Sequence, residues 1–285
     1  GLGDVYKRQP QDKMPKGAPL AELLRPQRLG DVVGQDKLIG PDGRLQRMLD
    51  QGELASIIFW GPPGTGKTTI ARLLADEAGM AYEPVSAVFD GVADLRKVFA
   101  RAADRLKTGE RTLLFVDEVH RFNKAQQDGL LPRVEDGTVT LVGATTENPS
   151  FALNGALLSR AQVMVLERLS STALQALLAR VEAHAGHSLP LEADTREALV
   201  AMADGDGRYL LNMASALLRA PRDQMIGTDT LADIVAGRAP AFDRDGDQHY
   251  NLMSALHKTL RGSDTDAALY WLARMFAGGE DPHYI

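Results

Sequence analysis

Residues 61–68 read Gly61-Pro62-Pro63-Gly64-Thr65-Gly66-Lys67-Thr68. An apolar run at 56–60 precedes this stretch and predicts a buried strand, and a helical pattern at 69–75 follows it. A G-x-x-x-x-G-K-[ST] loop between a strand and a helix is typical of a phosphate-binding site. The alternative is a Gly/Pro-rich turn whose lysine points to solvent. Such a turn does not require that the whole G-x-x-x-x-G-K-[ST] pattern stand between a strand and a helix.

The residue types in this loop suit a nucleoside triphosphate. The glycines allow backbone N–H groups to point at a phosphate, and the positive end of the following helix lies behind them. Lys67 is expected to reach the β- and γ-phosphates, and the Thr68 hydroxyl is expected to ligate Mg²⁺. The sequence therefore predicts ATP and Mg²⁺ as ligands. The predicted nucleotide contacts of this loop are Gly61, Pro62, Pro63, Gly64, Thr65, Gly66, Lys67, Thr68 and Thr69.

Composition excludes several classes of protein. Of its 285 residues, 44% are hydrophobic and 25% charged, which is typical of an ordinary globular protein. The length favours two packing units. No apolar run is long enough to cross a bilayer, so we expect no membrane partner and a cytoplasmic location. The absence of Cys excludes disulfides, thiolate zinc sites and thiol catalysis. The net charge of −6 argues against binding nucleic acid over the whole surface, although a local basic stripe is compatible with it.

Apolar runs alternate with helical patterns as far as residue 167, after a loop-rich lead-in at 20–34. This alternation predicts an α/β fold in which a parallel five-stranded sheet lies between helices and binds ligands at the carboxyl ends of its strands. The predicted strands are 56–60, 80–85, 111–118, 138–144 and 162–166, with helices at 43–51, 94–106, 123–135 and 153–159. Helical patterns without strands follow at 172–185, 195–203, 208–219 and 230–236, which indicates an all-helical second unit.

Two acids end the apolar run at 111–118. Asp117 is expected to hold the Mg²⁺ shell and Glu118 to polarise the attacking water, because hydrolysis of a γ-phosphate needs mainly positioning and charge neutralisation. An acidic pair at a strand end is otherwise a solvated turn, and the phosphate loop upstream favours the catalytic interpretation. After the next strand, Thr146 is the first choice for contacting the γ-phosphate or the water, and Asn148 the second. A helix cap is the alternative for Asn148.

Two arginines lie at predicted helix ends, Arg160 after 157–159 and Arg208 after Gly205-Asp206-Gly207. A guanidinium group is a preferred partner of phosphate oxygens. Each arginine alone is more typical of an ordinary surface position than of an arginine finger.

Together these stretches resemble the AAA+ ATPases of the clamp-loader and Holliday-junction-motor group. Within that group, the sequence is similar to the replication-associated recombination protein A family (RarA/MgsA) over about residues 20–285. The similarity is carried by residues 116–124 (VDEVHRFNK), 147–151 (ENPSF), 256–258 (LHK) and 261–264 (RGSD).

The resemblance implies a role for each matched residue. Lys67 and Thr68 belong to the phosphate loop, and Asp117 and Glu118 form the Walker B pair. Thr146 matches sensor 1, Arg208 matches sensor 2, and Arg160 matches an arginine finger that acts on a neighbouring subunit. The matched segment Val33-Gly34-Gln35 adds Val33 as a nucleotide contact.

The resemblance also implies domain boundaries. We expect a disordered tail at 1–19, an ATPase core at 20–167, a helical lid at 168–238, and the start of a helical oligomerisation domain at 239–285. Helices predicted at 250–260 and 264–276 begin that last domain, so the chain is expected to be a truncated part of a longer protein. Two departures from the family pattern, Phe89-Asp90 and Gly129, concern packing or DNA contacts and not the nucleotide.

The function implied by the resemblance is that of a DNA-dependent ATPase at stalled replication forks, acting in recombination and repair. Its expected partners are forked or junction DNA, further copies of itself in a tetramer, single-strand-binding protein and other replisome proteins on the nucleoid. Arg121 and Lys124 are candidates for phosphate contacts, or simply begin a solvated helix. The alternatives are a clamp-loader subunit, a branch-migration motor, or a slow nucleotide-gated DNA-binding switch, against which the water-activating acid Glu118 argues.

Overall fold

The structure is a computed structural model that describes residues 19–221, 225–236, 256, 259–260 and 265–277. The chain divides into two compact units, residues 1–232 and 233–285. The predicted core and most of the predicted lid fall in the first unit, and their boundary at 167/168 stays a prediction. The predicted tail up to residue 18, most of the predicted helix at 250–260 and the stretch 237–247 lie outside the described residues.

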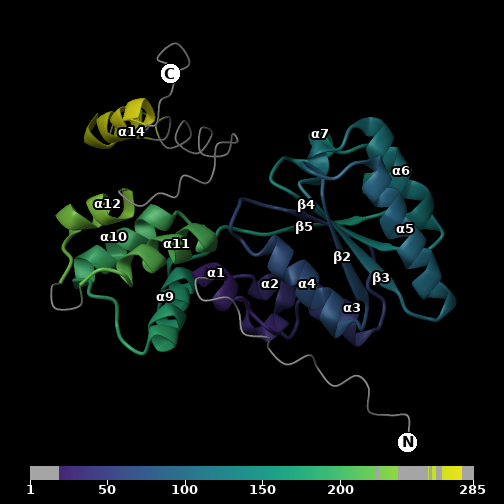
Figure 1. The fold of residues 1–285 in the computed structure, drawn as a ribbon, viewed down its shortest axis with the longest axis horizontal. Coiled ribbons are helices and arrows are strands. Elements are labelled where there is room, and N and C mark those ends of the chain that lie inside the picture. Colours follow the sequence, from purple (N-terminus) through teal and green to yellow (C-terminus); the bar gives the residue numbers. More distant parts are fainter. Residues whose placement is uncertain (1–18, 222–224, 237–255, 257–258, 261–264, 278–285) are drawn as a thin grey trace, which may run out of the picture. The chain divides into compact units, whose positions relative to one another are not determined.

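The first unit contains a five-stranded parallel sheet in the order β2-β3-β4-β1-β5 (Figure 1). This confirms the predicted α/β fold. The strands are β1 (Ile57–Trp60), β2 (Ala81–Ser86), β3 (Thr112–Asp117), β4 (Thr140–Thr145) and β5 (Gln162–Val165). Their register pairs Trp60 with Thr145 and Ser86 with Asp117, so the carboxyl ends of the strands meet at one edge of the sheet.

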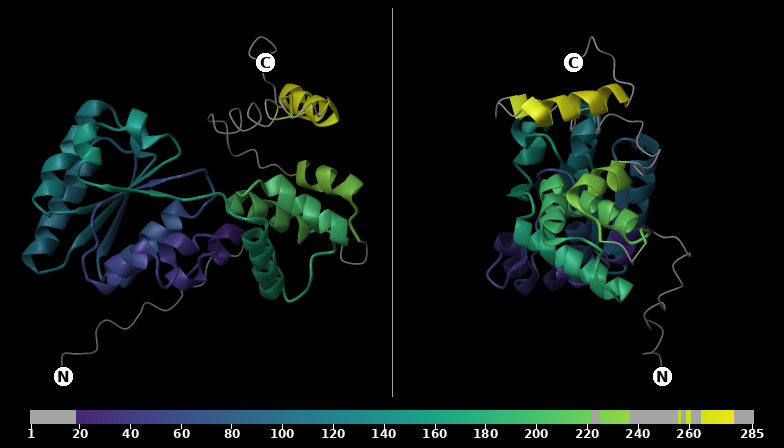
Figure 2. Two further views of the ribbon diagram at one scale, coloured as in Figure 1. Left: turned by 180° about the vertical axis from the view of Figure 1, so that it is seen from behind. Right: turned by 90° about the vertical axis from the view of Figure 1, so that its left-hand side faces the viewer.

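Helices connect these strands and cover both faces of the sheet (Figures 1 and 2). The helices of this part are α1 (Leu20–Leu23), α2 (Asp36–Ile39), α3 (Arg44–Asp50), α4 (Lys67–Glu77), α5 (Val92–Lys107), α6 (Lys124–Glu135), α7 (Pro149–Ala152) and α8 (Gly155–Leu158), with 3₁₀ turns η1 (Leu29–Asp31) and η2 (Val119–Arg121). The sequence did not reveal α1, α2, η1 or η2, because a single turn shows no periodicity. It indicated α7 only through the helix-cap alternative for Asn148.

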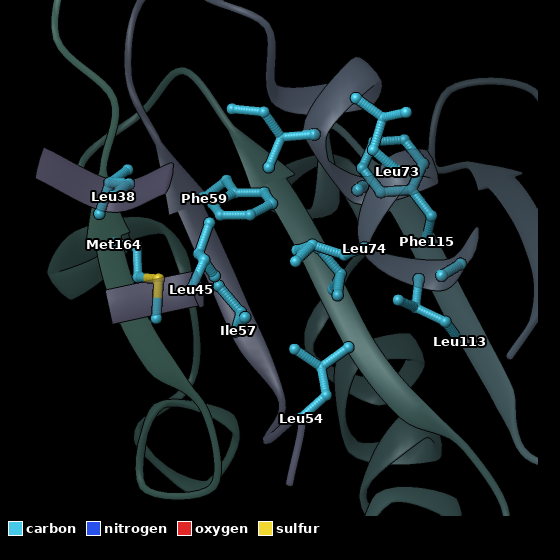
Figure 3. Close-up of a cluster of buried hydrophobic side chains, with 14 of the residues drawn as sticks. Leu38, Leu45, Leu54, Ile57, Phe59, Leu73, Leu74, Leu113, Phe115 and Met164 are labelled. Carbon is cyan, nitrogen blue, oxygen red and sulfur yellow. The ribbon is translucent and has the colours of Figure 1, made fainter. Parts of the chain in front are cut away.

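Alternation of side chains along the buried strands explains why both faces need a helical layer. Ile57 and Phe59 of β1 point to the face covered by α3 and α4, and Ile58 points to the face covered by α5 and α6. Every one of these side chains is fully buried. Figure 3 shows the first cluster, in which Leu45 of α3 and Leu74 of α4 pack against β1. A strand buried on both faces is therefore a continuous apolar run.

The helical part that follows the sheet consists of α9 (Ser171–Ala185), α10 (Ala193–Ala203), α11 (Gly207–Leu217) and α12 (Thr228–Ala236). Leu178 of α9 and Leu210 and Leu217 of α11 are fully buried. Ser170 caps α9 by accepting a hydrogen bond from the backbone N–H of Ala173. The predicted run of helices without strands is thus confirmed. In the second unit, α14 (Thr265–Ala277) places Ala268 against Leu256 in a small apolar cluster.

The helix α6 forms in spite of Gly129 and Pro132. Its start is fixed by a capping box, in which Gln126 N donates to Asn123 Oδ1 at 3.0 Å and Asn123 N donates to Gln126 Oε1 at 2.9 Å. A Cβ on Gly129 would meet no atom within 4 Å, so close packing does not require glycine there.

Glu83 of the edge strand β2 is buried between two arginines of α5. It accepts hydrogen bonds from Arg101 Nη2 and Arg105 Nη1, each at 2.6 Å. The bond from Arg101, ahead of that from Arg105, lowers the pKa of Glu83 although burial opposes this. Because folding lowers this pKa, the charged carboxylate stabilises the fold above its unfolded pKa, and the contribution is lost as pH falls through the folded value.

We therefore expect Glu83→Gln to lower the free energy of unfolding at pH 7 by about 1–3 kcal/mol, because it removes a buried charged acceptor. The difference from the unaltered chain should shrink as the pH falls below the unfolded value. Urea unfolding of both chains at pH 7 and in acid measures this. Asp104→Asn, which removes a surface partner of Lys107, is the control and should change little. Equal stabilities of Glu83→Gln and the unaltered chain at pH 7 would show that the pair is not stabilising.

Candidate nucleotide site

The phosphate loop joins β1 to α4 in a conformation that needs glycine. Gly64 has a φ of 68°, and a Cβ on it would lie 1.8 Å from Asp206 Oδ1. A Cβ on Gly61 would lie 2.2 Å from the carbonyl oxygen of Leu166. Thr65 is buried, and its hydroxyl donates to the carbonyl of Pro62 at 3.0 Å. The loop is therefore held closely between β5 and the start of α11.

Lys67 is the first residue of α4 and is only 8% exposed. Its Nζ donates to the carbonyl oxygens of Gly61 and Pro62, both at 2.7 Å. Burial lowers the pKa of Lys67, and the charges of Glu118 and Asp117 oppose that effect. A desolvated ammonium at a helix N-terminus is a favourable partner for phosphate oxygens, which accept more strongly than neutral carbonyls.

The predicted acidic pair lies at the carboxyl end of β3. Asp117 is the last residue of the strand, and Glu118 follows with a left-handed backbone, φ 50° and ψ 47°. This conformation costs a non-glycine residue about 1 kcal/mol or more. It turns the chain sharply after the strand. The negative charges of both carboxylates raise the pKa of Lys67 against the effect of burial, so the structure brings these three predicted residues together.

Thr146 follows β4, the strand next to β3. Its hydroxyl donates to Glu118 Oε2 at 3.4 Å, so the predicted sensor contacts the predicted water-activating acid. Asn148 does not take part in this cluster, because its Oδ1 accepts from Ser150 N at 3.0 Å and caps α7. The structure therefore shows the helix-cap alternative for Asn148.

Thr68 and Asp117 are the residues predicted to hold Mg²⁺. Both are half-buried, Thr68 in the first turn of α4 and Asp117 at the end of β3. A hydroxyl and a carboxylate suit Mg²⁺, which usually takes one or two protein ligands and completes its shell with phosphate oxygens and water. A site of this kind, shared with phosphate and water, does not need a cage of protein ligands. Among the described residues, no group of three or more His, Asp or Glu forms such a cage. The donor chemistry thus fits the ion.

The start of α11 contacts the phosphate loop. Gly207 N donates to the carbonyl of Gly64 at 3.2 Å, and Asp206 caps the helix by accepting from Tyr209 N at 2.8 Å. The charge of Arg208 reaches Lys67 and contributes to lowering its pKa. The structure therefore places the predicted sensor 2 residue, which is exposed, within electrostatic range of the loop.

Gln35 is a site residue that the sequence did not single out. It is 4% exposed, and its Nε2 donates to the carbonyls of Glu167 at 2.8 Å and Thr65 at 3.4 Å. It thus joins the lead-in to the phosphate loop and to the chain leaving β5. Val33 lies two residues earlier in this segment and is half-buried. The only local sign of this contact in the sequence was the neighbouring Gly34. Glycine suits the turn found there, which has a φ of 77° and packs against Leu169.

Arg160 is not brought to the phosphate loop. Its Nη1 donates to the carbonyl of Ala156 at 2.8 Å and to Ser159 Oγ at 2.9 Å, and its Nε pairs with Glu135 Oε1 at 2.5 Å. The side chain is 38% exposed. These partners lie on α6 and α8, whereas Lys67 lies at the start of α4.

Three family models match the chain. The model described as "ATPase family associated with various cellular activities (AAA)" matches residues 57–169, "AAA C-terminal domain" matches 185–261, and "MgsA AAA+ ATPase C terminal" matches 262–285. In the described ranges, no helix is long and apolar enough to cross a membrane.

Replication-associated recombination protein A of Escherichia coli K12 is 44% identical over 277 residues, which are 94% of this chain and 62% of that protein. The protein of the same name from Coxiella burnetii is 47% identical, again over 94% of the chain and 62% of that protein. The chain thus spans about three fifths of the length of these relatives. ATPase WRNIP1 of Dictyostelium discoideum is 38% identical over 94% of the chain and 33% of its own length.

Among solved structures, the RuvB Holliday junction branch migration motor of Thermotoga maritima superposes with a TM-score of 0.60 and 25% identity. The match covers 84% of this chain and 80% of that one. The fold, the three family models and the relatives agree in one assignment. The chain belongs to the replication-associated recombination protein A (RarA/MgsA) family of AAA+ ATPases.

Proposed function

We propose that the chain hydrolyses ATP to ADP and phosphate and uses this reaction on DNA in replication-linked recombination and repair. One observation supports the hydrolysis above all. Lys67, Glu118 and Thr146, which follow β1, β3 and β4, form one cluster at the carboxyl edge of the sheet. Ligands of open α/β sheets bind at that edge.

Each residue of the cluster has a proposed task in the reaction. The N–H groups of the phosphate loop and Lys67 bind the β- and γ-phosphates, and Arg208 contacts them from α11. Thr68 and Asp117 would hold Mg²⁺, which would supply positive charge to offset the charge on the phosphate oxygens. Glu118 orients a water toward the γ-phosphorus and accepts its proton. The bond from that phosphorus to the bridging oxygen breaks, and ADP leaves with inorganic phosphate. Thr146 orients the Glu118 carboxylate and the water.

The names of the relatives support DNA as the partner, and the carboxyl edge of the sheet adds a physical reason. The exposed aromatic side chains Phe89, 85% exposed after β2, and Phe151, 89% exposed in α7 after β4, lie on either side of β3. Arg121 and Lys124 follow β3 and are exposed as well. Basic residues flanked by aromatic rings suit contacts with phosphates and stacking with unpaired bases. We propose that these four residues bind the single-stranded part of forked DNA.

Phosphate release measured with and without forked DNA tests this assignment. We expect Phe89→Ala combined with Phe151→Ala to weaken binding of single-stranded DNA by about tenfold or more, since each stacked base contributes about 1–3 kcal/mol. Turnover without DNA should be unchanged. Lys107→Glu is the control, because Lys107 lies at the other end of α5. Wild-type DNA affinity in the double variant would refute this surface, and an ATPase that no DNA stimulates would refute DNA as the partner.

A branch-migration motor is the second candidate, because the solved structures that are similar to this chain include the Thermotoga maritima RuvB motor. The arginine finger implies a ring or other closed assembly of copies of the chain. Strand exchange from a synthetic four-way junction separates the two functions. A motor moves the junction with ATP, whereas a fork-acting ATPase binds the junction without moving it.

A further inference from the structure

His120 lies in η2, directly beyond the Walker B pair, and its side chain is 4% exposed. Its Nδ1 is 3.2 Å from Glu118 Oε2 and 3.0 Å from Thr145 Oγ1. Its Nε2 is 3.5 Å from Glu147 Oε1. The imidazole ring is therefore buried between the proposed water-activating acid and the segment that follows β4.

The hydrogen bonds around Thr145 determine which ring nitrogen carries a proton. A threonine hydroxyl donates one hydrogen bond and accepts two. The Thr145 hydroxyl donates to the carbonyl of Glu147 at 3.2 Å and accepts from Glu147 N at 3.1 Å. It therefore has one acceptor position for His120 Nδ1 and no proton to offer it.

The Glu118 carboxylate is also an acceptor. When the Thr145 hydroxyl donates to Glu147, both neighbours of Nδ1 accept, and this pattern assigns a hydrogen to Nδ1 that is shared between Thr145 and Glu118. With this tautomer, every donor and acceptor of Thr145 is satisfied. The ring then forms a bridge from the end of β4 to the acid that follows β3.

We propose that His120 is a positioning residue for ATP hydrolysis, which holds the Glu118 carboxylate in the orientation that activates water. This inference rests on the proposed ATPase function. Glutamate has three freely rotating side-chain bonds, and the side chain of Glu118 is 29% exposed. The contact from Thr146 is long, at 3.4 Å, so the bridge from His120 adds a shorter anchor on the same oxygen, Oε2. A catalytic group displaced by 1 Å loses about 10²-fold in rate.

The bridge also connects the acid to the sensor. Thr145, which the ring contacts, precedes Thr146, which contacts the same carboxylate. A movement of the chain after β4 when nucleotide binds would therefore reach Glu118 through two neighbouring residues. His120 and the fully buried Thr145 are the buried members of this group, whereas Thr146 and Glu147 are exposed.

Three substitutions test the bridge by steady-state kinetics and by ATP titration. We expect His120→Ala to lower kcat at least tenfold while the Kd for ATP changes less than twofold, because the phosphate loop is intact. His120→Asn retains an N–H near the Nδ1 position and should recover most of kcat. His120→Gln places its N–H near the Nε2 position and should not. His184→Ala removes an exposed histidine of α9 and serves as the matched control.

The pattern of recovery separates positioning from folding, since a purely structural role does not distinguish Asn from Gln. A kcat for His120→Ala within twofold of the wild-type value would overturn the proposal. So would equal losses in all three variants. A wild-type chain that binds ATP without hydrolysing it would refute the proposed ATPase function, which these comparisons assume.

NMR of the imidazole nitrogens tests the bridge without any turnover. In the nucleotide-free chain we expect the hydrogen of His120 on Nδ1, and we expect Glu118→Gln to shift the His120 signals and not those of His184. The signals are assigned by their loss in His120→Asn. A hydrogen on Nε2 only, with no response to Glu118→Gln, would contradict the bridge even if the ATPase assignment holds.

Discussion

Replacing Glu118 with Gln is expected to lower kcat for ATP hydrolysis by about 10²- to 10⁴-fold and to leave ATP binding intact. The amide has nearly the same size as the carboxylate and can still accept the hydrogen bond from Thr146. It cannot accept the proton of the attacking water. Lys67, Thr68 and the phosphate loop are unchanged, so the Kd for ATP should stay within a few-fold of the wild-type value. Phosphate release and fluorescent-nucleotide titration measure the two quantities separately.

Two further variants make the Glu118 result specific. Glu110→Gln changes an exposed acid that follows α5, at the amino end of β3, and should leave kcat unchanged. Lys67→Ala should instead weaken ATP binding itself, because it removes the ammonium that is proposed to bind the phosphates. If Glu118→Gln turned over ATP at nearly the wild-type rate, the assignment of the water-activating acid would be wrong.

Removing the Arg160 guanidinium with Arg160→Ala is expected to lower kcat by about 10³-fold or more, the usual contribution of an arginine finger. In the described chain, the partners of Arg160 are Ala156, Ser159 and Glu135, away from its own phosphate loop. A role in catalysis therefore requires the nucleotide of another subunit. Mixing Arg160→Ala with Lys67→Ala should restore part of the activity, since some mixed interfaces join an intact phosphate loop to an intact Arg160.

The mixing experiment requires that the two variants assemble together, which crosslinking of differently tagged chains establishes. Arg133→Ala is the matched control, because Arg133 is exposed on α6 and pairs with Asp136. It should keep the wild-type rate. No recovery of activity in mixed assemblies would count against action across a subunit interface, and so would an Arg160→Ala chain with a wild-type rate.

Much of the fold was predictable because the signals are local. The strands β1, β3 and β4 are buried on both faces, so each is an apolar run that needs no alignment to be recognised. The phosphate loop carries its own sequence pattern, and Asp117 and Glu118 stand at the end of a strand that its apolar run reveals. The single-turn helix α7 shows no periodicity, and only the helix-cap alternative for Asn148, followed by Pro149 in the first turn, indicated where it starts.

The remaining parts of the site depend on contacts between distant residues. Gln35 contacts Glu167 across 132 positions, and nothing near Gln35 in the sequence indicates this partner. Asp206 looks like an ordinary helix cap, and its approach to Gly64 follows only from how α11 packs on the loop. His120 is two residues from Glu118, yet its role depends on Thr145 of another strand. Local patterns therefore predict the chemistry, and tertiary packing determines what orients it.

We propose that the residues that follow β1, β3 and β4 form one ATP-hydrolysing site. Mg²⁺-dependent phosphate release by the wild-type chain at saturating ATP, with Lys67→Ala as the blank, tests it most directly. We expect turnover in the wild-type chain that depends on Mg²⁺ and rises with forked DNA, and no turnover above background in Lys67→Ala. A wild-type chain that binds ATP and Mg²⁺ but releases no more phosphate than Lys67→Ala would contradict it.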